Sequence, residues 1–526
     1  MNNICTHIIA HRYSIASALF GALVFLLVWG WQLDVSRIDW IMAPGGDLSQ
    51  HYLGWKFFRM APSAWPLGFI PSLAYPIGAP LALTDSIPLL AFIFRPFANF
   101  LPEPFQYLGI WGLVSLTLQG CFGFALSKRY LGNSRQALLA STLFVLTPLL
   151  LSRITMHTAL TAHWLILAAL CLLLSMNTKI LPWSLLITAA ILIHPYLALL
   201  VLGTNLLAAL REHNYKSLGA SVVIMLVISW AIGLFKGEPS AVGYGYATLS
   251  LDALLNPMGW SSFLPTLPTG PYQFEGLLYP GIGVLFLVAM SLAHKPTRTT
   301  LKTLPKQFPF LFSTCVFLII IAISHQVWLG DTIIARLPLS RGMVEDFFGI
   351  VRASGRLIWP VYYLVLTALM ALLAKRNKKT QLIILGIALT LQILDLRTPL
   401  LAAHARSNIT WQSPLQDQLW QEIPKYYDHI WIMPAASSTT FTGAGYEPIA
   451  LYAAEHGMTL NAAYFSRPLR GLTEQMNEGL ATLRRGGDEQ TAYVFFDDPI
   501  TFSTAANISP VRLRSFDGFT LYLPRH

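Results

Sequence analysis

The amino-acid sequence predicts an α-helical polytopic membrane protein with a smaller α/β domain at its C-terminal end. Three observations carry this prediction. Of the 526 residues, 54% are hydrophobic and only 11% are charged, whereas soluble domains carry about 25% charged residues. Apolar stretches long enough to cross a bilayer recur along the chain as far as residue 394. Beyond that residue the composition becomes that of an ordinary soluble domain, so a wholly soluble protein is excluded.

About eleven spans are predicted from stretches without charge. A bilayer core of about 30 Å needs roughly 20 apolar residues in a helix. The first stretch resembles a signal peptide, but its length and the lack of a small-residue cleavage site favour a retained anchor. The stretch Ile180–Leu210 is counted as two spans, the fifth and the sixth. It is too long for one helix and contains His194-Pro195, where proline interrupts the helical hydrogen bonds. The stretches free of Asp, Glu, Lys and Arg are Tyr13–Leu33, Pro104–Ser127, Gln136–Ser152, Ile154–Thr178, Ile180–Leu210, Ser217–Phe235, Gly276–His294, Gln307–Gly330, Leu357–Ala374 and Thr380–Leu394.

The distribution of basic residues predicts the orientation. With a cytoplasmic N-terminus, the inside segments hold 15 basic residues and one acid, Glu212. This is the bias that cytoplasmic loops show, so the net charge of +10 indicates membrane topology rather than a nucleic-acid partner. The prediction is a multi-pass protein of the bacterial inner (cytoplasmic) membrane with its C-terminal domain in the periplasm. The inside basic residues are Arg12, Lys128, Arg129, Arg135, Lys179, Arg211, Lys216, Lys295, Arg298, Lys302, Lys306, Lys375, Arg376, Lys378 and Lys379.

One segment leaves an alternative topology open. Ser86–Leu101 is apolar but short for a span and contains Arg95-Pro96, so we interpret it as a juxtamembrane or re-entrant element. If it crosses the membrane and Ile180–Leu210 is a single span, His157 and His163 move inside. That version places several basic residues on the outer side, which makes it the less favoured one.

The chain after Leu394 predicts a small extracytoplasmic domain, with the boundary between residues 1–399 and 400–526. Short β-branched or aromatic runs predict strands, and runs with helical periodicity predict helices between them. Asp517-Gly518 predicts a hairpin turn. The predicted strands are His429–Met433, Ala492–Phe496 and Phe519–Leu523, and the predicted helices are Pro414–Tyr427, Ile449–His456 and Leu472–Leu483.

The long first outside loop, residues 34–103, carries the first candidate site residues. Pro44-Gly45-Gly46 breaks any preceding helix and lets the backbone approach a ligand. Asp47, Gln50 and His51 follow at i, i+3 and i+4, which places them on one face of a starting helix. A carboxylate at a helix start is also an ordinary N-cap, and only convergence with other polar groups favours a functional role for Asp47.

Several ionisable residues far apart in sequence fall at the same predicted membrane face as Asp47. Ionisable groups at membrane depth are costly and usually functional. Each also has a structural explanation: a histidine before proline can satisfy freed backbone, a loop carboxylate can be solvated, and arginines can extend to the interface. His157 and His163 lack metal-ligand spacing, which argues against a zinc site at these residues. No cofactor is predicted, and dependence on a divalent metal stays open. The residues are His157, His163, His194, Glu275, Arg341, Arg352 and Arg356.

These groups suit the transfer of a sugar from a lipid phosphate. Arginines can bind the donor phosphate bidentately and stabilise its charge as it leaves; Arg341, Arg352 and Arg356 are the candidates. A carboxylate, Asp47, can take the proton from an acceptor hydroxyl. The remaining candidates for substrate contact are Gln50, His51, His157, His163, His194 and Glu275.

The layout resembles the GT-C glycosyltransferases, which use polyprenyl-phosphate sugars. The shared features are an N-terminal anchor, a long first outside loop with an Asp near its start, many spans and a C-terminal extracytoplasmic domain. The strings Gly46–Trp55, Arg352–Pro360 and Tyr272–Gly276 more narrowly resemble a bacterial family of uncharacterised multispanning proteins near that superfamily. The resemblance implies that Asp47 is the catalytic Asp of the first loop, acting as general base in an inverting transfer to a glycan, lipid or protein. The loop departs from the superfamily in lacking a clear second acidic pair.

Two other function classes stay open. A transporter or flippase of lipid-linked sugars would favour polar residues near the middle of the spans. A polysaccharide polymerase typically uses a large late outside loop with arginines, and Val327–Arg356 contains four of them. A structural or assembly role is the least favoured.

Overall fold

The computed structural model is mostly helical and describes residues 2–240, 243–339, 342, 348–433, 446–496 and 513–525; of the N-terminal residues 2–10 it describes the backbone only. The chain divides into two compact units. The first unit comprises Met1–Asp34, Tyr107–Met225 and Ala241–Asn408. The second comprises Val35–Gln106, Leu226–Ser240 and Ile409–His526. The first loop thus belongs to the same compact unit as the C-terminal segment, while the domain boundary at residue 399 stays a prediction.

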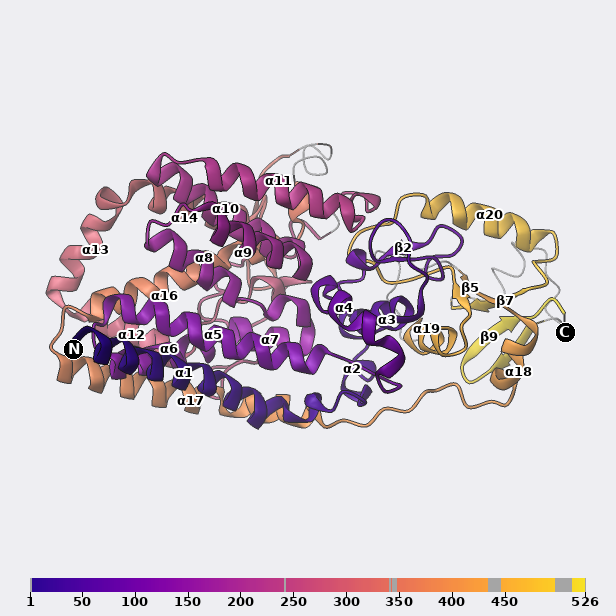
Figure 1. The fold of residues 1–526 in the computed structure, drawn as a ribbon, viewed down its shortest axis with the longest axis horizontal. Coiled ribbons are helices and arrows are strands. Elements are labelled where there is room, and N and C mark those ends of the chain that lie inside the picture. The colour runs from indigo at the N-terminus through magenta and orange to yellow at the C-terminus, as the bar shows by residue number, and fades with distance from the viewer. Residues whose placement is uncertain are drawn as a thin grey trace. The chain divides into compact units, whose positions relative to one another are not determined.

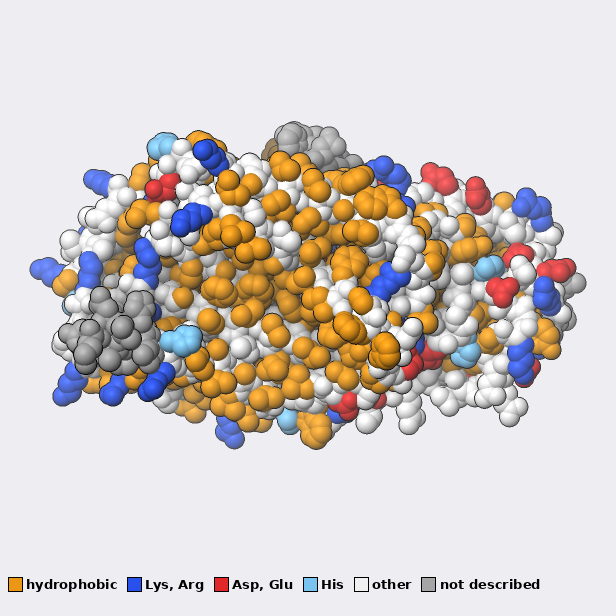
Figure 2. All heavy atoms as spheres, in the orientation of Figure 1, with side chains coloured by type: hydrophobic (Ala, Val, Ile, Leu, Met, Phe, Trp, Pro, Cys, Tyr) orange, Lys and Arg blue, Asp and Glu red, His pale blue; other side chains and the backbone are white. Residues whose placement is uncertain are grey.

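The first unit is built from apolar helices (Figure 1). The face of this unit that Figure 2 shows is rich in hydrophobic side chains, which suits contact with lipid. Its elements are α1 (Asn2–Trp29), η1 (Gly30–Leu33), α5 (Leu108–Tyr130), α6 (Ser134–Val145), α7 (Pro148–Met156), η4 (Thr158–Thr161), α8 (Trp164–Leu174), α9 (Ile180–Ile193), α10 (Pro195–Glu212), most of α11 (Lys216–Ala231), η6 (Gln273–Gly276), α12 (Ile282–Ala293), α13 (Lys295–Gln307), α14 (Pro309–Ile323), β3 (Gln326–Leu329), β4 (Thr332–Arg336), η7 (Gly349–Val351), η8 (Ser354–Ile358), α16 (Trp359–Leu373) and α17 (Lys378–Ser407).

Small residues let α1 and α5 pack closely. A Cβ atom at Gly21 would lie 2.0 Å from the Leu116 carbonyl oxygen, and one at Gly120 would lie 2.2 Å from that of Ser17. The Ser17 hydroxyl donates to the Gly120 carbonyl over 2.8 Å. Small residues and interhelical hydrogen bonds of this kind drive helix association in membranes. The packing of α1 against α5 is therefore of the type found between membrane-spanning helices.

The predicted number of about eleven spans is wrong. Among the described residues, four helices are long and apolar enough to cross a membrane, or up to six if each of two bent pairs is one span. A stretch without charge is not necessarily one long helix. The break at His194-Pro195 occurs as predicted, but it leaves α9 with only 14 residues, or about 21 Å at 1.5 Å per residue. The four long spans are His11–Leu33, Leu108–Tyr130, Ser354–Leu373 and Lys378–Ser407; the bent pairs are Ser134–Val145 with Pro148–Met156 and Lys295–Gln307 with Pro309–Ile323. The structure therefore fits a multipass membrane protein with fewer full-length spans.

The second unit combines the first loop with a five-stranded sheet of order β6-β5-β7-β9-β8. Strand β5 pairs in parallel with β6 and β7, and β9 pairs antiparallel with β7 and β8. The elements of the unit are α2 (Asp39–Met42), α3 (Gly46–Met60), β1 (Phe69–Ile70), β2 (Ala79–Pro80), η2 (Leu81–Leu83), α4 (Pro88–Phe94), η3 (Arg95–Phe100), η5 (Leu234–Lys236), α18 (Leu419–Tyr426), β5 (His429–Met433), α19 (Tyr446–Glu455), β6 (Thr459–Leu460), α20 (Leu472–Arg484), β7 (Thr491–Phe495), β8 (Leu513–Phe516) and β9 (Phe519–Tyr522).

The predicted C-terminal strands and helices are confirmed with bounds within three residues, except that α18 begins at Leu419 rather than at Pro414. The turn at Asp517-Gly518 joins β8 to β9 with φ values of 51° and 79°, the left-handed pair that a two-residue hairpin requires. Backbone of the first loop extends this sheet: the amide of Leu460 donates to the Ser72 carbonyl over 2.8 Å, and that of Tyr75 to the Leu460 carbonyl over 2.9 Å. The first loop is therefore part of the folded sheet unit rather than a free connector.

Candidate functional site

Helix α3 begins at the Gly45-Gly46 pair, and a residue of α19 caps it. Gly45 and Gly46 have φ values of 68° and 66°, a region that glycine occupies without strain. The Gly46 amide donates to Glu447 Oε1 over 2.8 Å. The N-cap position is Gly45, so Asp47 lies in the first turn but not at the capping position. The capping explanation of Asp47 does not fit this geometry.

Asp47, Gln50 and His51 line a small polar cavity of about 10 Å³ in the second unit, which is room for about one water molecule. Its other lining residues are Thr84, Asp85, Tyr464 and Ser466. Gln50 and His51 are almost fully buried, with 2% and 1% exposure, whereas Asp47 is half-buried. The carboxylate of Asp47 is therefore the more accessible of the three groups.

Gln50 connects the first loop to the C-terminal residues. Its Oε1 accepts a hydrogen bond from the Tyr446 hydroxyl over 3.0 Å and one from the Tyr464 amide over 3.1 Å. Burial raises the pKa of Tyr446, so its hydroxyl keeps its proton and remains a donor. These two bonds fix the face of α3 on which Asp47 and His51 also lie.

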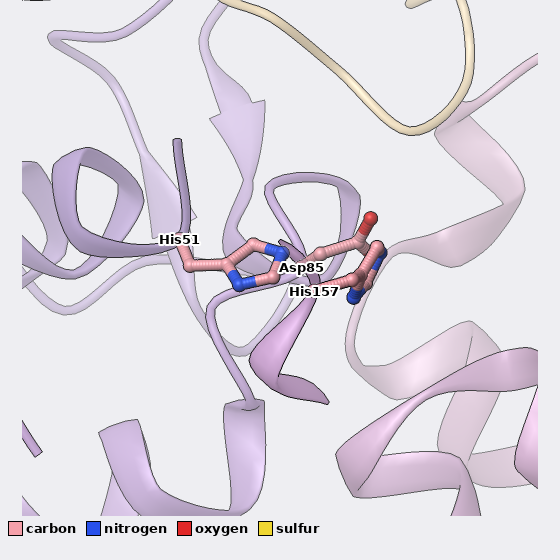
Figure 3. Close-up of side chains that lie close together, drawn as sticks. All are labelled: His51, Asp85 and His157. Carbon is pink, nitrogen blue, oxygen red and sulfur yellow. The ribbon is translucent and has the colours of Figure 1, made fainter. Parts of the chain in front are cut away.

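Asp85 is the candidate in this cavity that the sequence analysis missed. It follows η2 in the left-handed region, with φ 55°, and Ile87 beside it has φ 51°. Asp tolerates that conformation but a β-branched residue rarely adopts it, and such outliers cluster at functional sites. The ligand atoms of Asp85 and His51 lie within 4.8 Å of each other, as the side chains in Figure 3 illustrate. Carboxylate oxygens and imidazole nitrogens are donor types that divalent cations accept.

Helix α3 approaches the Asp85 loop closely at Gly54. A Cβ atom there would lie 2.1 Å from Thr84 Oγ1 and 2.3 Å from Ser86 Oγ. The hydroxyls of Thr84 and Ser86 also lie 2.7 Å apart in a hydrogen bond. Only glycine fits at position 54, so the sequence fixes the Asp85 loop against the helix that carries Asp47.

In the first unit, Glu275 lies between two buried arginines. Its Oε2 accepts hydrogen bonds from Arg153 Nη1 and Arg356 Nε, each over 2.8 Å, and its Oε1 accepts one from Arg356 Nη2 over 2.5 Å. Exposures are 1% for Arg153, 7% for Glu275 and 8% for Arg356. We call these three residues the Glu275 triad. Two guanidinium groups and one carboxylate leave it with an excess of one positive charge.

The arginines determine the charge state of Glu275. Burial by itself would raise the pKa of this carboxyl, but the charges of Arg153 and Arg356 outweigh burial and hold the pKa well below its usual range. The carboxylate therefore stays ionised at any physiological pH and is a weak proton acceptor. Its geometry suits the orientation of the two guanidinium groups better than general-base catalysis.

His157 and His194 lie beside the Glu275 triad. Their ring centroids are 5.2 Å apart, and the Arg356 guanidinium lies 4.7 Å from the centre of the Tyr196 ring. Burial lowers the pKa of His157 to about 3, the charge of Arg356 adds to this, and Glu275 opposes it. His157 is therefore neutral at physiological pH. His194 Nδ1 accepts a hydrogen bond from the Tyr196 amide over 3.1 Å, so this imidazole caps α10 after the proline break.

The remaining predicted site residues that the structure describes belong neither to the Asp47 cavity nor to the Glu275 triad. His163 is fully buried, and its Nδ1 lies 2.9 Å from the Tyr363 hydroxyl, which also accepts a hydrogen bond from Gln119 over 3.1 Å. Arg352 is half-buried at the end of η7. Arg341 lies outside the described residues. The structure thus groups Asp47, Gln50 and His51 in the second unit, and His157, His194, Glu275 and Arg356 in the first.

Arg153 was missed in the sequence although it is the most buried arginine of the triad. The signal was present: it is a single charge within an otherwise apolar run, between Ser152 and Ile154. An unpaired charge there would be costly. Its partner Glu275 is 122 residues away in sequence, a pairing that local pattern does not reveal.

Two protein-family models match the chain. A model described as "Domain of unknown function (DUF6311)" matches residues 18–397, and one described as "DUF6311 C-terminal domain" matches residues 419–524. The chain belongs to the DUF6311 family. No curated protein matches it. The DUF6311 match covers the helices of the first unit together with the loop that carries Asp47 and Asp85, and the C-terminal match covers the sheet.

Proposed function

We propose that this DUF6311 protein is an inverting membrane glycosyltransferase of the GT-C type, which moves a sugar from a polyprenyl-phosphate donor to an acceptor outside the cytoplasm. The observation that carries the proposal is the pairing of Asp47 with Asp85 and His51 around one polar cavity. Asp85 supplies a second acid at this cavity, beside Asp47. Both lie in the segment that joins the candidate spans α1 and α5.

The chemical step assigns a role to Asp47. The acceptor oxygen attacks the anomeric carbon, the bond between that carbon and the phosphate oxygen breaks, and the carboxylate of Asp47 takes the acceptor proton. The lipid phosphate leaves with the bonding electrons, and the configuration at the anomeric carbon inverts. A positioned general base of this kind contributes about 10²–10⁴-fold to the rate.

The donor phosphate is assigned to arginines of the first unit. The Glu275 triad has a net positive charge in a buried setting, and Arg352 precedes Arg356 by one helical turn of sequence. Arg356 already forms a bidentate pair with Glu275, so we give the direct phosphate contact first to Arg352. Arg341 keeps the same assigned role. Guanidinium groups suit phosphate because their planar donors match two phosphate oxygens.

Asp85→Asn is expected to lower turnover by about 10²-fold, because the loss of one positioning charge in a catalytic cavity misplaces the reacting groups. Asparagine tolerates the left-handed backbone at this position, so folding should persist. The measurement is transfer of a radiolabelled sugar from prenyl phosphate by purified protein, with the thermal unfolding temperature as a check on folding. Wild-type turnover in a folded Asp85→Asn protein would remove Asp85 from the mechanism.

The proposed location is the bacterial inner membrane, with the Asp47 loop and the sheet on the periplasmic side, and the basic residues of α13 predict the cytoplasmic side. Single cysteines placed between Lys295 and Lys306 are expected to resist an impermeant thiol reagent added to intact cells. Cysteines placed near Gly270 or beyond Ala405 are expected to react. Labelling of the first group from outside would reverse the orientation.

A transporter of lipid-linked sugar is the second candidate, favoured by the buried polar contacts among His163, Tyr363 and Gln119. Gln119 lies in the middle of α5, where polar residues are expensive. The two candidates differ in a reconstituted assay. Transfer to an acceptor without movement of the donor across the bilayer supports the glycosyltransferase, and movement without transfer supports the transporter.

A further inference from the structure

A basic cavity lies at one end of the first unit, away from any residue given a role above. Its volume is about 790 Å³, within the range of ligand pockets, about 300–1,000 Å³. Three cationic side chains from three segments line it: Arg12 of α1, Lys128 near the end of α5 and Arg135 of α6. None of the described residues along its wall is acidic. The other lining residues are Tyr13, Ala16, Gly132, Asn133, Ser134 and Leu138.

The arrangement leaves positive charge available to an anion. The Nζ of Lys128 donates to the Gly132 carbonyl, and Arg135 Nε donates to the Tyr13 hydroxyl over 3.4 Å. Both partners are neutral, so neither bond offsets the charge. The N-terminus of α6 also lines the cavity, but the Asn133 side chain already caps it by accepting a hydrogen bond from the Arg135 amide over 2.9 Å, so the positive charge comes from the three side chains.

The depth of the cavity matches the level of lipid headgroups. Two candidate spans end here, one beginning at His11 and the other ending at Tyr130. Lys and Arg side chains gather around this end of the unit, where the N-terminus of α1 lies (Figures 1 and 2). Basic pockets between membrane helices at this level bind anionic headgroups.

An apolar stripe on α1 leads away from the cavity into the span. Ile15, Leu19 and Leu23 are exposed by 47%, 62% and 50%, and their spacing of four residues places them on one helix face. A free phosphate or a nucleotide has no apolar chain to contact these side chains, whereas the acyl chain of a lipid would lie along them. The combination of cationic cavity and adjacent apolar stripe therefore favours a lipid over a soluble anion.

We propose that this cavity binds the phosphodiester headgroup of an anionic phospholipid, with an acyl chain along the α1 stripe. The site is separate from the proposed glycosyltransferase chemistry and does not depend on it. Arg12 and Arg135 hold the phosphate charge, and the exposed face of α1 holds the chain.

The test measures binding of phosphatidylglycerol to the purified full-length protein by native mass spectrometry in a zwitterionic detergent. A basic residue in contact with the headgroup contributes about fivefold to the affinity for that bound lipid. The double variant Arg12→Gln/Arg135→Gln is therefore expected to bind about 25-fold more weakly. The matched control, Lys216→Gln/Lys379→Gln, loses the same charge at exposed positions outside the cavity wall and should bind like wild type.

A second variant separates the cavity from general electrostatics. Ala16→Trp fills the wall while keeping every charge, and it should also lose phosphatidylglycerol. Equal loss in the control, or undiminished binding in Ala16→Trp, would overturn the proposal. Competition by inorganic phosphate at the same concentration as the lipid would also overturn it, because the site would then recognise a free anion.

Discussion

Asp47→Asn is expected to lower the rate of sugar transfer by about 10²–10⁴-fold, the usual effect of losing a general base. Asparagine has the same size as aspartate, but its amide is not a base and does not take the proton from the hydroxyl group of the acceptor substrate. Donor affinity should stay close to that of wild type, since the phosphate contacts are assigned to arginines. The measurement is turnover and donor affinity of purified protein with a prenyl-phosphate sugar.

The Asp47 variant should fold. The amide of Gly46, the first residue of α3, donates to Glu447 rather than to Asp47. The favourable interaction of a first-turn carboxylate with the helix dipole is worth about 0.3–1 kcal/mol, too little for its loss to unfold the protein. Asp39→Asn is the matched control: it removes a carboxylate from the same loop, one that bonds to the Trp411 amide over 2.9 Å and is outside the cavity wall. Near-normal turnover of Asp47→Asn would leave Asp47 with only a structural role in α3, and Asp85 would become the next candidate base.

Arg352→Lys should show the opposite kinetic pattern. Lysine keeps the charge but loses the planar fork that matches two phosphate oxygens. Donor affinity should therefore fall while turnover at saturating donor changes little. The same result for Arg352→Lys and Asp47→Asn would show that the two residues do not divide binding from proton transfer.

Much of the second unit was predictable because its signals are local. The run His429–Met433 has the β-branched and aromatic character of a strand, and it forms β5. Asp517-Gly518 carries its turn geometry in two residues. Strand β6 has only two residues, Thr459 and Leu460, and pairs partly with the first loop, so no local pattern reveals it.

The helices of the first unit were harder to predict. Absence of charge defines where a chain can enter lipid, but helix length depends on where backbone hydrogen bonds stop. Proline at the start of α7, α10 and α14 divides apolar sequence into shorter helices. Counting residues between charges therefore overestimates the number of full spans.

The candidate site divides in the same way. The spacing of Asp47, Gln50 and His51 predicts a shared face, and all three line one cavity. Asp85 and Arg153 were missed because what makes them candidates is proximity to residues far away in sequence. Asp85 reaches the cavity through a left-handed turn and the close approach of α3 at Gly54, neither of which has a local sequence signature.

Glu275→Gln is expected to destabilise the first unit by about 3–5 kcal/mol, the cost of breaking a buried ion pair by removing one partner. The variant leaves the guanidinium groups of Arg153 and Arg356 buried without a counter-charge from position 275. The apparent unfolding temperature in detergent should fall by roughly 10 °C. Glu212→Gln is the matched control, because its partner Arg211 is 40% exposed and surface pairs contribute little. Equal unfolding temperatures for the two variants would mean that the triad does not stabilise the fold.

The pH dependence of the stability difference between wild type and Glu275→Gln tests whether the ionised carboxylate is the cause of the stabilisation. The arginines hold the folded pKa of Glu275 below its usual value, so the stabilisation is fully present above the unfolded pKa, about 4.3. It is lost as the pH falls through the folded pKa. The difference in stability between wild type and Glu275→Gln should therefore stay constant from about pH 8 to pH 6 and narrow only below about pH 4.5. A difference that already narrows near neutral pH would show that a group other than the Glu275 carboxylate controls the stabilisation.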